Sequence, residues 1–308
     1  MSASHSFNTS STARYSIMTA HKVLLVWLCP LPRPLLREIA LYLPPCFYFL
    51  GISATTLTLY LLPGDYRQTL THDGCFSDGM RHCWVNSSEA LLVGGGTYLQ
   101  RNRFGLNSVF LFRVEPLIVC YYPSMQEARY SPGVVCVDGT VFVFGGYHHR
   151  SLDSGEKAEV ARKIWKQLPK MTYGRHSFCP VHYAGNIYLP DISKGNRALE
   201  AYSVAQDVYE TMSIACESSS AHSCAFLLQE RLVVLSCYNF AWSWEIGTGR
   251  SEQVKVKTGV TVLSSCAPRV AGNCVYWVEF DSGRLACMDL NSLQSPSTQS
   301  KKTASSGG

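Results

Sequence analysis

The sequence predicts an all-β fold built from repeated antiparallel sheets. Pairs of short apolar runs are separated by turn residues, and these pairs recur every 43 to 50 residues. The composition agrees, because 16% of the 308 residues are charged and 12% are aromatic. Few charges and many aromatic side chains suit strands that are packed on both faces, and they argue against disorder.

The clearest hairpin signal lies at residues 134–146, with the sequence VVCVDGTVFVFGG. Two apolar runs flank Asp138-Gly139, a dipeptide that favours a tight type I′ turn. The second run ends in Gly145-Gly146, where the missing Cβ atoms let the chain turn and let a neighbouring strand approach closely. We therefore expect Asp138, Gly139, Gly145 and Gly146 to have structural roles.

The same pattern of two runs recurs along the chain, at residues 84–96, 177–190, 224–235 and 268–278. The second strands of the five hairpins begin at Leu91, Val141, Ile187, Leu232 and Val275, which are 50, 46, 45 and 43 residues apart. A period near 45 residues is the length of a four-stranded blade. Such blades must stack, because none can bury its apolar faces alone.

The residues between the hairpins extend the pattern. After the Gly-Gly pair come a third strand, a strand that carries Trp165, a Leu-Pro-x-Met-like turn and an arginine. This order resembles the Kelch repeat over roughly residues 84–295, and most specifically over residues 125–171. Arg129 and Arg175 open their repeats. The resemblance implies a β-propeller in which both arginines bond backbone carbonyls and Trp165 fills the wedge between blades.

The predicted fold class is therefore an all-β, Kelch-type propeller of six blades, each with four antiparallel strands; five blades are the alternative. The sixth blade would draw on residues 46–70, which would close the ring with the C-terminal unit. We expect four regions: a disordered leader at residues 1–30, a short amphipathic helix at 31–45, the propeller at 46–293 and a disordered tail at 294–308.

Residues 31–45 carry apolar side chains at helical spacing, namely Leu35, Leu36, Ile39 and Leu43. The segment resembles the first helix of an F-box, which implies contact with the adaptor of a cullin-type ubiquitin ligase. An F-box has three helices, however, and the sequence already becomes strand-like at Cys46. A short helix that caps the propeller is the alternative interpretation.

Charge and cysteine content exclude several classes of protein. The net charge of +5 is spread along the chain without a run of five Lys or Arg residues, which argues against nucleic-acid binding. Residues 39–64 are uncharged, but three prolines and the alternation at residues 55–60 favour strands over a membrane span. Thirteen cysteines without a Cys-x-x-Cys pair indicate reduced core thiols and a cytoplasmic location.

Tyr147-His148-His149 follows the Gly-Gly pair directly and is expected on the rim of the propeller. Adjacent histidines could bind a metal ion, but the ligand sets of Kelch-like copper oxidases and of iron-dependent Kelch proteins are not recognisable here. The sequence also lacks a Gly-x-Ser-x-Gly motif, a phosphate-binding loop and a His-Glu-x-x-His motif. We therefore predict a non-enzymatic protein without metal or cofactor.

The resemblance implies that a protein partner binds through the rim loops, with contacts at Tyr98, Ser131, Tyr147, His149 and Ser177. Our leading hypothesis is an interaction module that acts as the substrate receptor of a cullin-type ubiquitin ligase. The alternatives are a cytoskeletal or scaffold-binding propeller without a ligase link and, third, a metal-dependent propeller enzyme.

Overall fold

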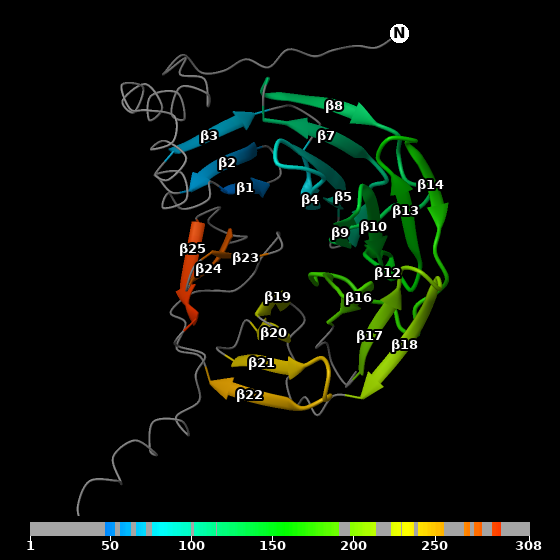
Figure 1. Ribbon diagram of the computed structural model, residues 1–308. Helices are drawn as coiled ribbons and strands as arrows, with labels where there is room; N and C mark the ends of the chain where they lie inside the picture. Colours follow the sequence, from blue (N-terminus) through cyan, green and yellow to red (C-terminus); the bar gives the residue numbers. More distant parts are fainter. Residues whose placement is uncertain are drawn as a thin grey trace, which may run out of the picture.

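The computed structural model describes residues 47–52, 56–62, 66–71, 76–99, 102–114, 116–190, 198–213, 223–228, 230–236, 240–255, 268–271, 274–278 and 285–290. Nearly all the regular structure in these ranges is β-strand, as predicted. Figure 1 shows the sheets fanned around a common axis, as the blades of a propeller are. The predicted leader, the helix at 31–45 and the tail at 294–308 lie outside the described residues.

Among the described residues, four antiparallel sheets have at least four strands. One contains β4 (Asp78–Trp84), β5 (Glu89–Leu99), β6 (Asn102–Gly105), β7 (Val109–Arg113) and β8 (Ile118–Tyr122). The next contains β9 (Gly133–Val137), β10 (Thr140–Phe144), β13 (Gly155–Glu159) and β14 (Ile164–Gln167). The third contains β15 (Val181–Tyr183), β16 (Asn186–Leu189), β17 (Ala198–Ser203) and β18 (Val208–Ser213). The fourth contains β19 (Ser223–Leu228), β20 (Arg231–Ser236), β21 (Phe240–Glu245) and β22 (Ser251–Lys255).

Smaller sheets complete the described architecture. The first sheet along the chain contains β1 (Phe47–Ile52), β2 (Thr56–Leu62) and β3 (Tyr66–Thr71). The last contains β23 (Arg269–Ala271), β24 (Cys274–Val278) and β25 (Leu285–Asp289). A two-stranded sheet, β11 (Tyr147–His148) and β12 (Arg150–Ser151), lies within the connection between β10 and β13.

The number of complete blades differs from the predicted six blades of four strands each. Within the described ranges, four sheets reach four strands, and the sheets at the two ends have three. For the first sheet the reason is chain length, because only residues 72–77 separate β3 from β4 and cannot hold a further strand with its turns. A fourth strand after β25 would fall on residues outside the described part of the chain.

The innermost strands follow one another around the ring. β4 lies beside β1 and β9, β15 lies beside β9 and β19, and β19 lies beside β23. β1 also lies beside β24, so the first and last sheets meet (Figure 1). Each of these two sheets keeps its own strands in the described residues, and packing rather than a shared strand joins them.

The residues that set the sequence period form the core between neighbouring sheets. Leu91, Val141, Ile187, Leu232 and Val275 are each no more than 1% exposed. Leu91 and Val141 share one cluster, and Ile187 packs with Phe142 and Phe144 of the preceding sheet. Burying one such side chain contributes about 1.5–3 kcal/mol, which explains why an apolar residue recurs at each period.

Trp165 fills the junction between its own sheet and the preceding one. The side chain is 6% exposed, and its ring meets that of Tyr122 edge to face, with 6.4 Å between centroids. Its Nε1–H donates to the carbonyl oxygen of Pro123 at 2.7 Å. The indole therefore supplies both apolar area and a satisfied polar contact across the wedge.

Backbone geometry explains the glycines of the clearest hairpin. Asp138 and Gly139 both have positive φ angles, 46° and 74°, as a type I′ turn requires. At the other end of β10, the N–H of Gly145 donates to Ser154 O at 2.9 Å, and that of Gly146 donates to Arg175 O at 2.8 Å. The N–H of Gly146 thus ties the end of β10 to Arg175, in the segment that leads into the next sheet.

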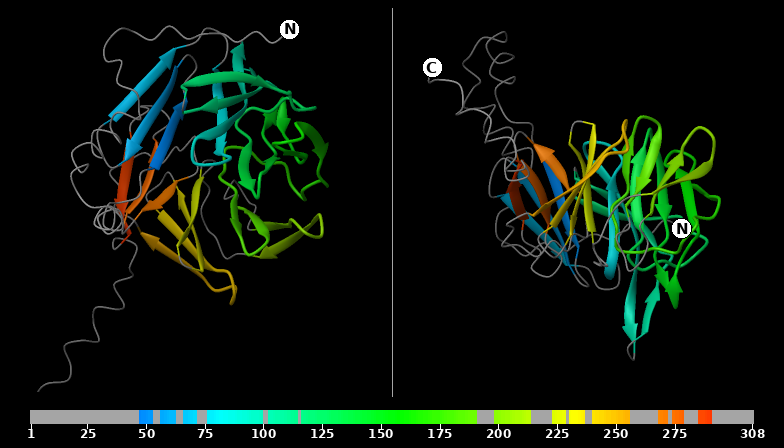
Figure 2. Two further views of the ribbon diagram at one scale, coloured as in Figure 1. Left: turned by 45° about the horizontal axis from the view of Figure 1, so that its top comes forward. Right: turned by 90° about the horizontal axis from the view of Figure 1, so that it is seen from below.

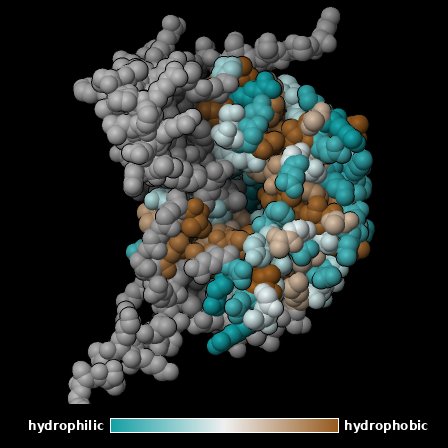
Figure 3. Space-filling view, viewed as in Figure 1, coloured by the Kyte–Doolittle hydropathy of each residue, from teal (hydrophilic) through white to brown (hydrophobic). Residues whose placement is uncertain are grey.

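The surface follows the same division between core and solvent. Figure 3 shows hydrophilic side chains over much of the outer margin and hydrophobic ones nearer the centre of the ring. Part of the uncharged segment at residues 39–64 forms β1 and β2. In the described residues, no helix has the length and apolar character needed to cross a bilayer.

Replacing Gly145 with alanine should destabilise the protein strongly. Gly145 has a φ angle of 59°, and a Cβ there would overlap the carbonyl oxygen of Arg175. Left-handed backbone and overpacking together predict a loss of about 2–5 kcal/mol, measurable by urea unfolding. Gly185 is the control: its φ is 79°, but no atom lies within 4 Å of an added Cβ. Equal losses for the two variants would contradict the proposed close approach.

Candidate functional site

One end of the ring carries a projecting hairpin. β5 and β6 pair beyond the body of their sheet, from Gly96 opposite Gly105 to Leu99 opposite Asn102. In the right view of Figure 2 this teal hairpin extends below the ring. β11 lies beside β6 and pairs with β12. We call the surface formed by residues 96–99, 102–105 and 147–151 the hairpin face.

His149 stands at the tip between β11 and β12. It is exposed, and its φ angle of 62° turns the chain sharply there. Its ring meets Phe104 of β6 edge to face, with 5.1 Å between centroids. Sequence reasoning missed Phe104, because nothing in the pattern showed that residues 102–105 would form an extra strand beside β11.

Tyr147 is held by both its backbone and its ring. Its N–H donates to Tyr130 O at 2.7 Å, and the N–H of Tyr130 donates to Tyr147 O at 2.9 Å. The half-buried ring lies 5.5 Å from that of His176, whose Nδ1 is 3.0 Å from Ser151 Oγ. The structure therefore brings Tyr147 and His149 together on the hairpin face.

The third predicted contact on this surface is Tyr98. Its backbone lies in the projecting part of β5, in register with Arg103 of β6. Tyr98 thus belongs to the same hairpin as Phe104.

Ser131 and Ser177 occupy a different environment from the one expected of rim contacts. They are only 4% and 5% exposed. Ser177 Oγ donates to Ser131 Oγ at 3.1 Å, and Arg81 Nη2 donates to Ser131 Oγ at 2.7 Å. Their N–H groups also link neighbouring sheets, Ser131 to Gly79 O and Ser177 to Ser131 O. Both residues thus tie inner strands together, and we leave them out of the surface proposed below.

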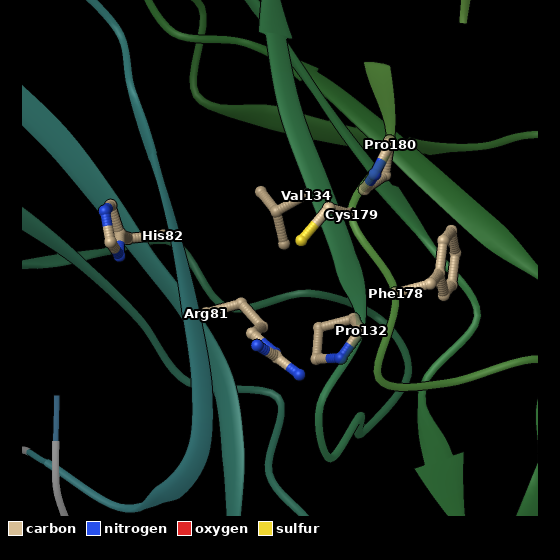
Figure 4. Close-up of a pocket in the computed structure, with 7 residues that line it drawn as sticks. All are labelled: Arg81, His82, Pro132, Val134, Phe178, Cys179 and Pro180. Carbon is tan, nitrogen blue, oxygen red and sulfur yellow. The ribbon is translucent and has the colours of Figure 1, made fainter. Parts of the chain in front are cut away.

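A small pocket lies beside these serines, between the inner ends of three sheets (Figure 4). It is lined by Arg81, His82, Pro132, Val134, Phe178, Cys179 and Pro180. Its volume, about 10 Å³, is near the minimum for one water molecule. Burial raises the pKa of the Cys179 thiol, which disfavours the nucleophilic thiolate. The pocket therefore has neither the volume nor the activated thiol of a catalytic site.

Arg129 forms a fully buried junction with Glu156 of β13. Its Nη2 is 3.2 Å from Glu156 Oε1, and its Nη1 donates to the carbonyl oxygens of Gly145 and Ser154 at 2.6 and 3.0 Å. Glu156 also accepts the N–H groups of Gln126 and Glu127, at 2.8 and 3.1 Å. Nearly every polar atom of this buried pair has a partner, as burial of charge demands.

Arg175 repeats this arrangement one sheet further along. Its guanidinium pairs with Glu200 of β17 and donates to Leu189 O at 2.7 Å. Glu200 accepts the N–H of Thr172 at 2.7 Å. Sequence reasoning missed both glutamates. A signal for them exists in the sequence: the third strand of each of these two sheets carries a glutamate at the same place. Glu156 comes two residues after Ser154, and Glu200 comes two residues after Ala198.

The hairpin face brings several rings close together. The rings of His148 and His149 are 4.5 Å apart in a T-shaped arrangement. Among the described residues, no group of three or more His, Cys, Asp or Glu side chains is placed to hold a metal ion. Rings and hydrogen-bond donors on projecting strands can contact a partner directly.

Replacing Arg129 with methionine should destabilise the protein by about 3–5 kcal/mol, because Glu156 would remain buried without its countercharge. Arg162 of the β13–β14 turn is the control. Its ion pair with Glu159 is exposed, so its replacement with methionine should cost less than about 1 kcal/mol. Urea unfolding of both variants tests this difference. A loss below about 1 kcal/mol for Arg129→Met would contradict the junction.

Comparison with known proteins agrees with this geometry. The family model described as Kelch motif matches residues 128–172, which run from the segment containing Arg129 through β9, β10, β13 and β14 to the turn after Met171. A comparison with curated proteins finds no match to the chain. The chain thus contains a Kelch motif, set within a β-propeller-like ring of antiparallel sheets.

Proposed function

We propose that this protein is a protein-interaction module whose hairpin face binds the partner. The Kelch propeller fold implies a module of this kind. The single observation that carries the choice of surface is the contact between His149 and Phe104, which joins two elements that project from the ring. Binding residues are commonly found on such connections, held in place by a rigid scaffold.

The hairpin face favours binding because its side chains are already held in place before a partner binds. Tyr147 is already fixed by two backbone hydrogen bonds to Tyr130, and His149 already rests on Phe104. Pre-formed contacts lower the entropy that a partner would otherwise have to offset. Aromatic side chains also supply much of the binding energy at protein interfaces. Tyr98 belongs to the proposed surface through its position on the same hairpin.

The second part of the proposal concerns the task that binding serves. We infer that the propeller presents its partner to a cullin-type ubiquitin ligase in the cytoplasm, with residues 31–45 contacting the ligase adaptor. The support is the helical spacing of Leu35, Leu36, Ile39 and Leu43. A scaffold-binding or cytoskeletal propeller is the competing function, and it requires no adaptor contact.

Replacing His149 with asparagine should weaken the binding of partners without unfolding the protein. Asparagine tolerates a positive φ angle but lacks the ring that meets Phe104. We expect labelling of the partners to fall about tenfold, the effect of losing about 1.4 kcal/mol of binding energy. Proximity labelling with quantitative mass spectrometry measures this.

Lys163→Asn is the matched control, because Lys163 is also exposed and has a φ angle of 59°. It lies in the β13–β14 turn, at the end of the four-stranded sheet opposite to that from which β11 and β12 extend. Unchanged labelling by the His149 variant, or equal loss in the control, would remove the hairpin face as the binding surface.

Deleting residues 31–45 should abolish co-purification with the cullin adaptor while leaving the partners of the hairpin face in place. A pull-down of the full chain and the deletion variant, each blotted for the adaptor, measures the first effect. Adaptor absent from both samples would favour the competing scaffold function and would leave the partner-binding proposal standing.

A further inference from the structure

The outer strand of the five-stranded sheet has an unpaired edge. β8 comes last in the order β4-β5-β7-β8, and within the described residues it pairs only with β7 (Figure 1). Pro123 follows the strand directly and ends its row of backbone donors, because proline has no N–H. One side of β8 therefore presents backbone N–H and C=O groups that no described strand pairs, which is a template for a further strand.

β8 lacks the charges that the neighbouring outer strands carry. Its five residues, Ile-Val-Cys-Tyr-Tyr at 118–122, are all uncharged. The outer strands of the next two sheets, β14 and β18, contain the exposed residues Lys166 and Glu210. Charged side chains on an edge strand discourage the addition of another chain. This protection is missing from β8.

Tyr121 adds apolar area to the same edge. It is 71% exposed, more than any other large hydrophobic residue in the described part of the chain. Its ring packs on that of the buried Phe110 of β7, with 5.2 Å between centroids, so its position is already set. A strand added beside β8 would gain apolar contact with this ring as well as backbone hydrogen bonds.

We infer that a second copy of this chain pairs with this edge, so that the two β8 strands run antiparallel about a two-fold axis. The pairing is self-complementary when Cys120, the middle residue of the strand, lies opposite its own copy. Cys120 has the smallest side chain of the five residues and is partly exposed, so it fits at the axis. Ile118 then lies opposite Tyr122 of the copy. Val119 likewise lies opposite Tyr121.

This register also brings the exposed rings together. Tyr121 and its copy lie diagonally across the two strands, about 7–8 Å apart, a separation that aromatic side chains span. Each packs on its own Phe110, so four rings form one row across the interface. An extended segment of another protein could make the same backbone hydrogen bonds, but only a second copy supplies the matching rings. The absence of charge also removes repulsion between identical strands.

The size of the contact determines its strength. A pair of five-residue strands buries less than the roughly 1,200 Å² of a stable interface, so we expect a weak dimer that depends on concentration. The inference is independent of the hairpin face. A dimer would nevertheless carry two such faces, and a partner with two binding segments would gain avidity from them.

Sedimentation equilibrium of the full chain over a range of concentrations tests the inference. We expect a reversible equilibrium between monomer and dimer. Tyr121→Lys should raise the dissociation constant of the dimer at least about tenfold, because it removes the exposed ring and brings two positive charges close together across the strands.

Ile164→Lys is the matched control. Ile164 is also an exposed apolar residue on an outer strand, at 61% exposure, but it lies in β14. This variant should dimerise like the unmodified protein. Equal thermal unfolding temperatures for the two variants would show that both are folded.

Cross-linking gives a second measurement, which does not depend on replacing Tyr121. A short bismaleimide should join two copies through Cys120, because the two thiols face each other at the axis. The Cys120→Ser variant should lose the cross-linked product. Cys287→Ser should keep it, although Cys287 is the more exposed cysteine.

A chain that stays monomeric up to about 0.5 mM would overturn the inference. A dimer that Tyr121→Lys leaves unchanged, or that Ile164→Lys weakens equally, would overturn it too, as would a cross-link that persists in Cys120→Ser. Binding of an extended segment of another protein to β8 of a monomeric chain would show that the edge serves a different occupant.

Discussion

The angle between neighbouring sheets depends on an arginine that is held by two sheets at once. The carbonyl oxygen of Arg175 accepts the N–H of Gly146 from the preceding sheet, while its guanidinium pairs with Glu200 of its own sheet. Arg129 has the same double attachment, to Gly95 and to Glu156. The buried ion pair fixes each arginine to its own sheet, and the carbonyl oxygen of the same residue ties the preceding sheet to it, so tilting the two sheets apart would break a buried hydrogen bond.

Not every sheet has a glutamate at the position that pairs with the arginine. In the five-stranded sheet, Phe110 lies two residues after Ser108 and opposite Leu92, just as Glu156 lies two residues after Ser154 and opposite Val143. Phe110 is 3% exposed and packs in the apolar cluster between the first two sheets. The equivalent register position thus holds an apolar residue in one sheet and a member of a buried ion pair in the next, which agrees with the near equivalence of the two solutions in energy.

The junction also creates the candidate binding surface. Gly146 is committed to Arg175 through its N–H, so the chain leaves the sheet after β10 and forms β11. In the preceding sheet β5 continues past its glycines into the projecting hairpin. The β5–β6 hairpin and the β11–β12 pair therefore both leave their sheets next to these arginine junctions. Phe104 of the first meets His149 of the second.

Local patterns in the sequence predicted the strands well and the surroundings of individual side chains poorly. Asp138-Gly139 specified its turn because only a few residues tolerate two successive positive φ angles. The recurrence of Leu91 and Val141 marked the core because burial demands an apolar residue at each period. Ser131 and Ser177 followed the expected spacing, yet a left-handed backbone conformation turns them toward neighbouring inner strands, and spacing carries no information on that direction. Glu156 was missed, since its buried partner Arg129 lies 27 residues away in the chain and no local pattern connects them.

The way in which the ring closes has a consequence for biosynthesis. β1 pairs with β2, and it meets β24 only by packing. The first sheet is synthesised first, so the flank that packs against the last sheet stays uncovered until that sheet has been synthesised. The Arg–Glu joints of the middle sheets can form during translation, because their members are close in sequence, whereas the final seam can form only after synthesis reaches β25. Nascent chains should consequently depend most on chaperones at the first sheet, whose β1 must remain available for packing against β24.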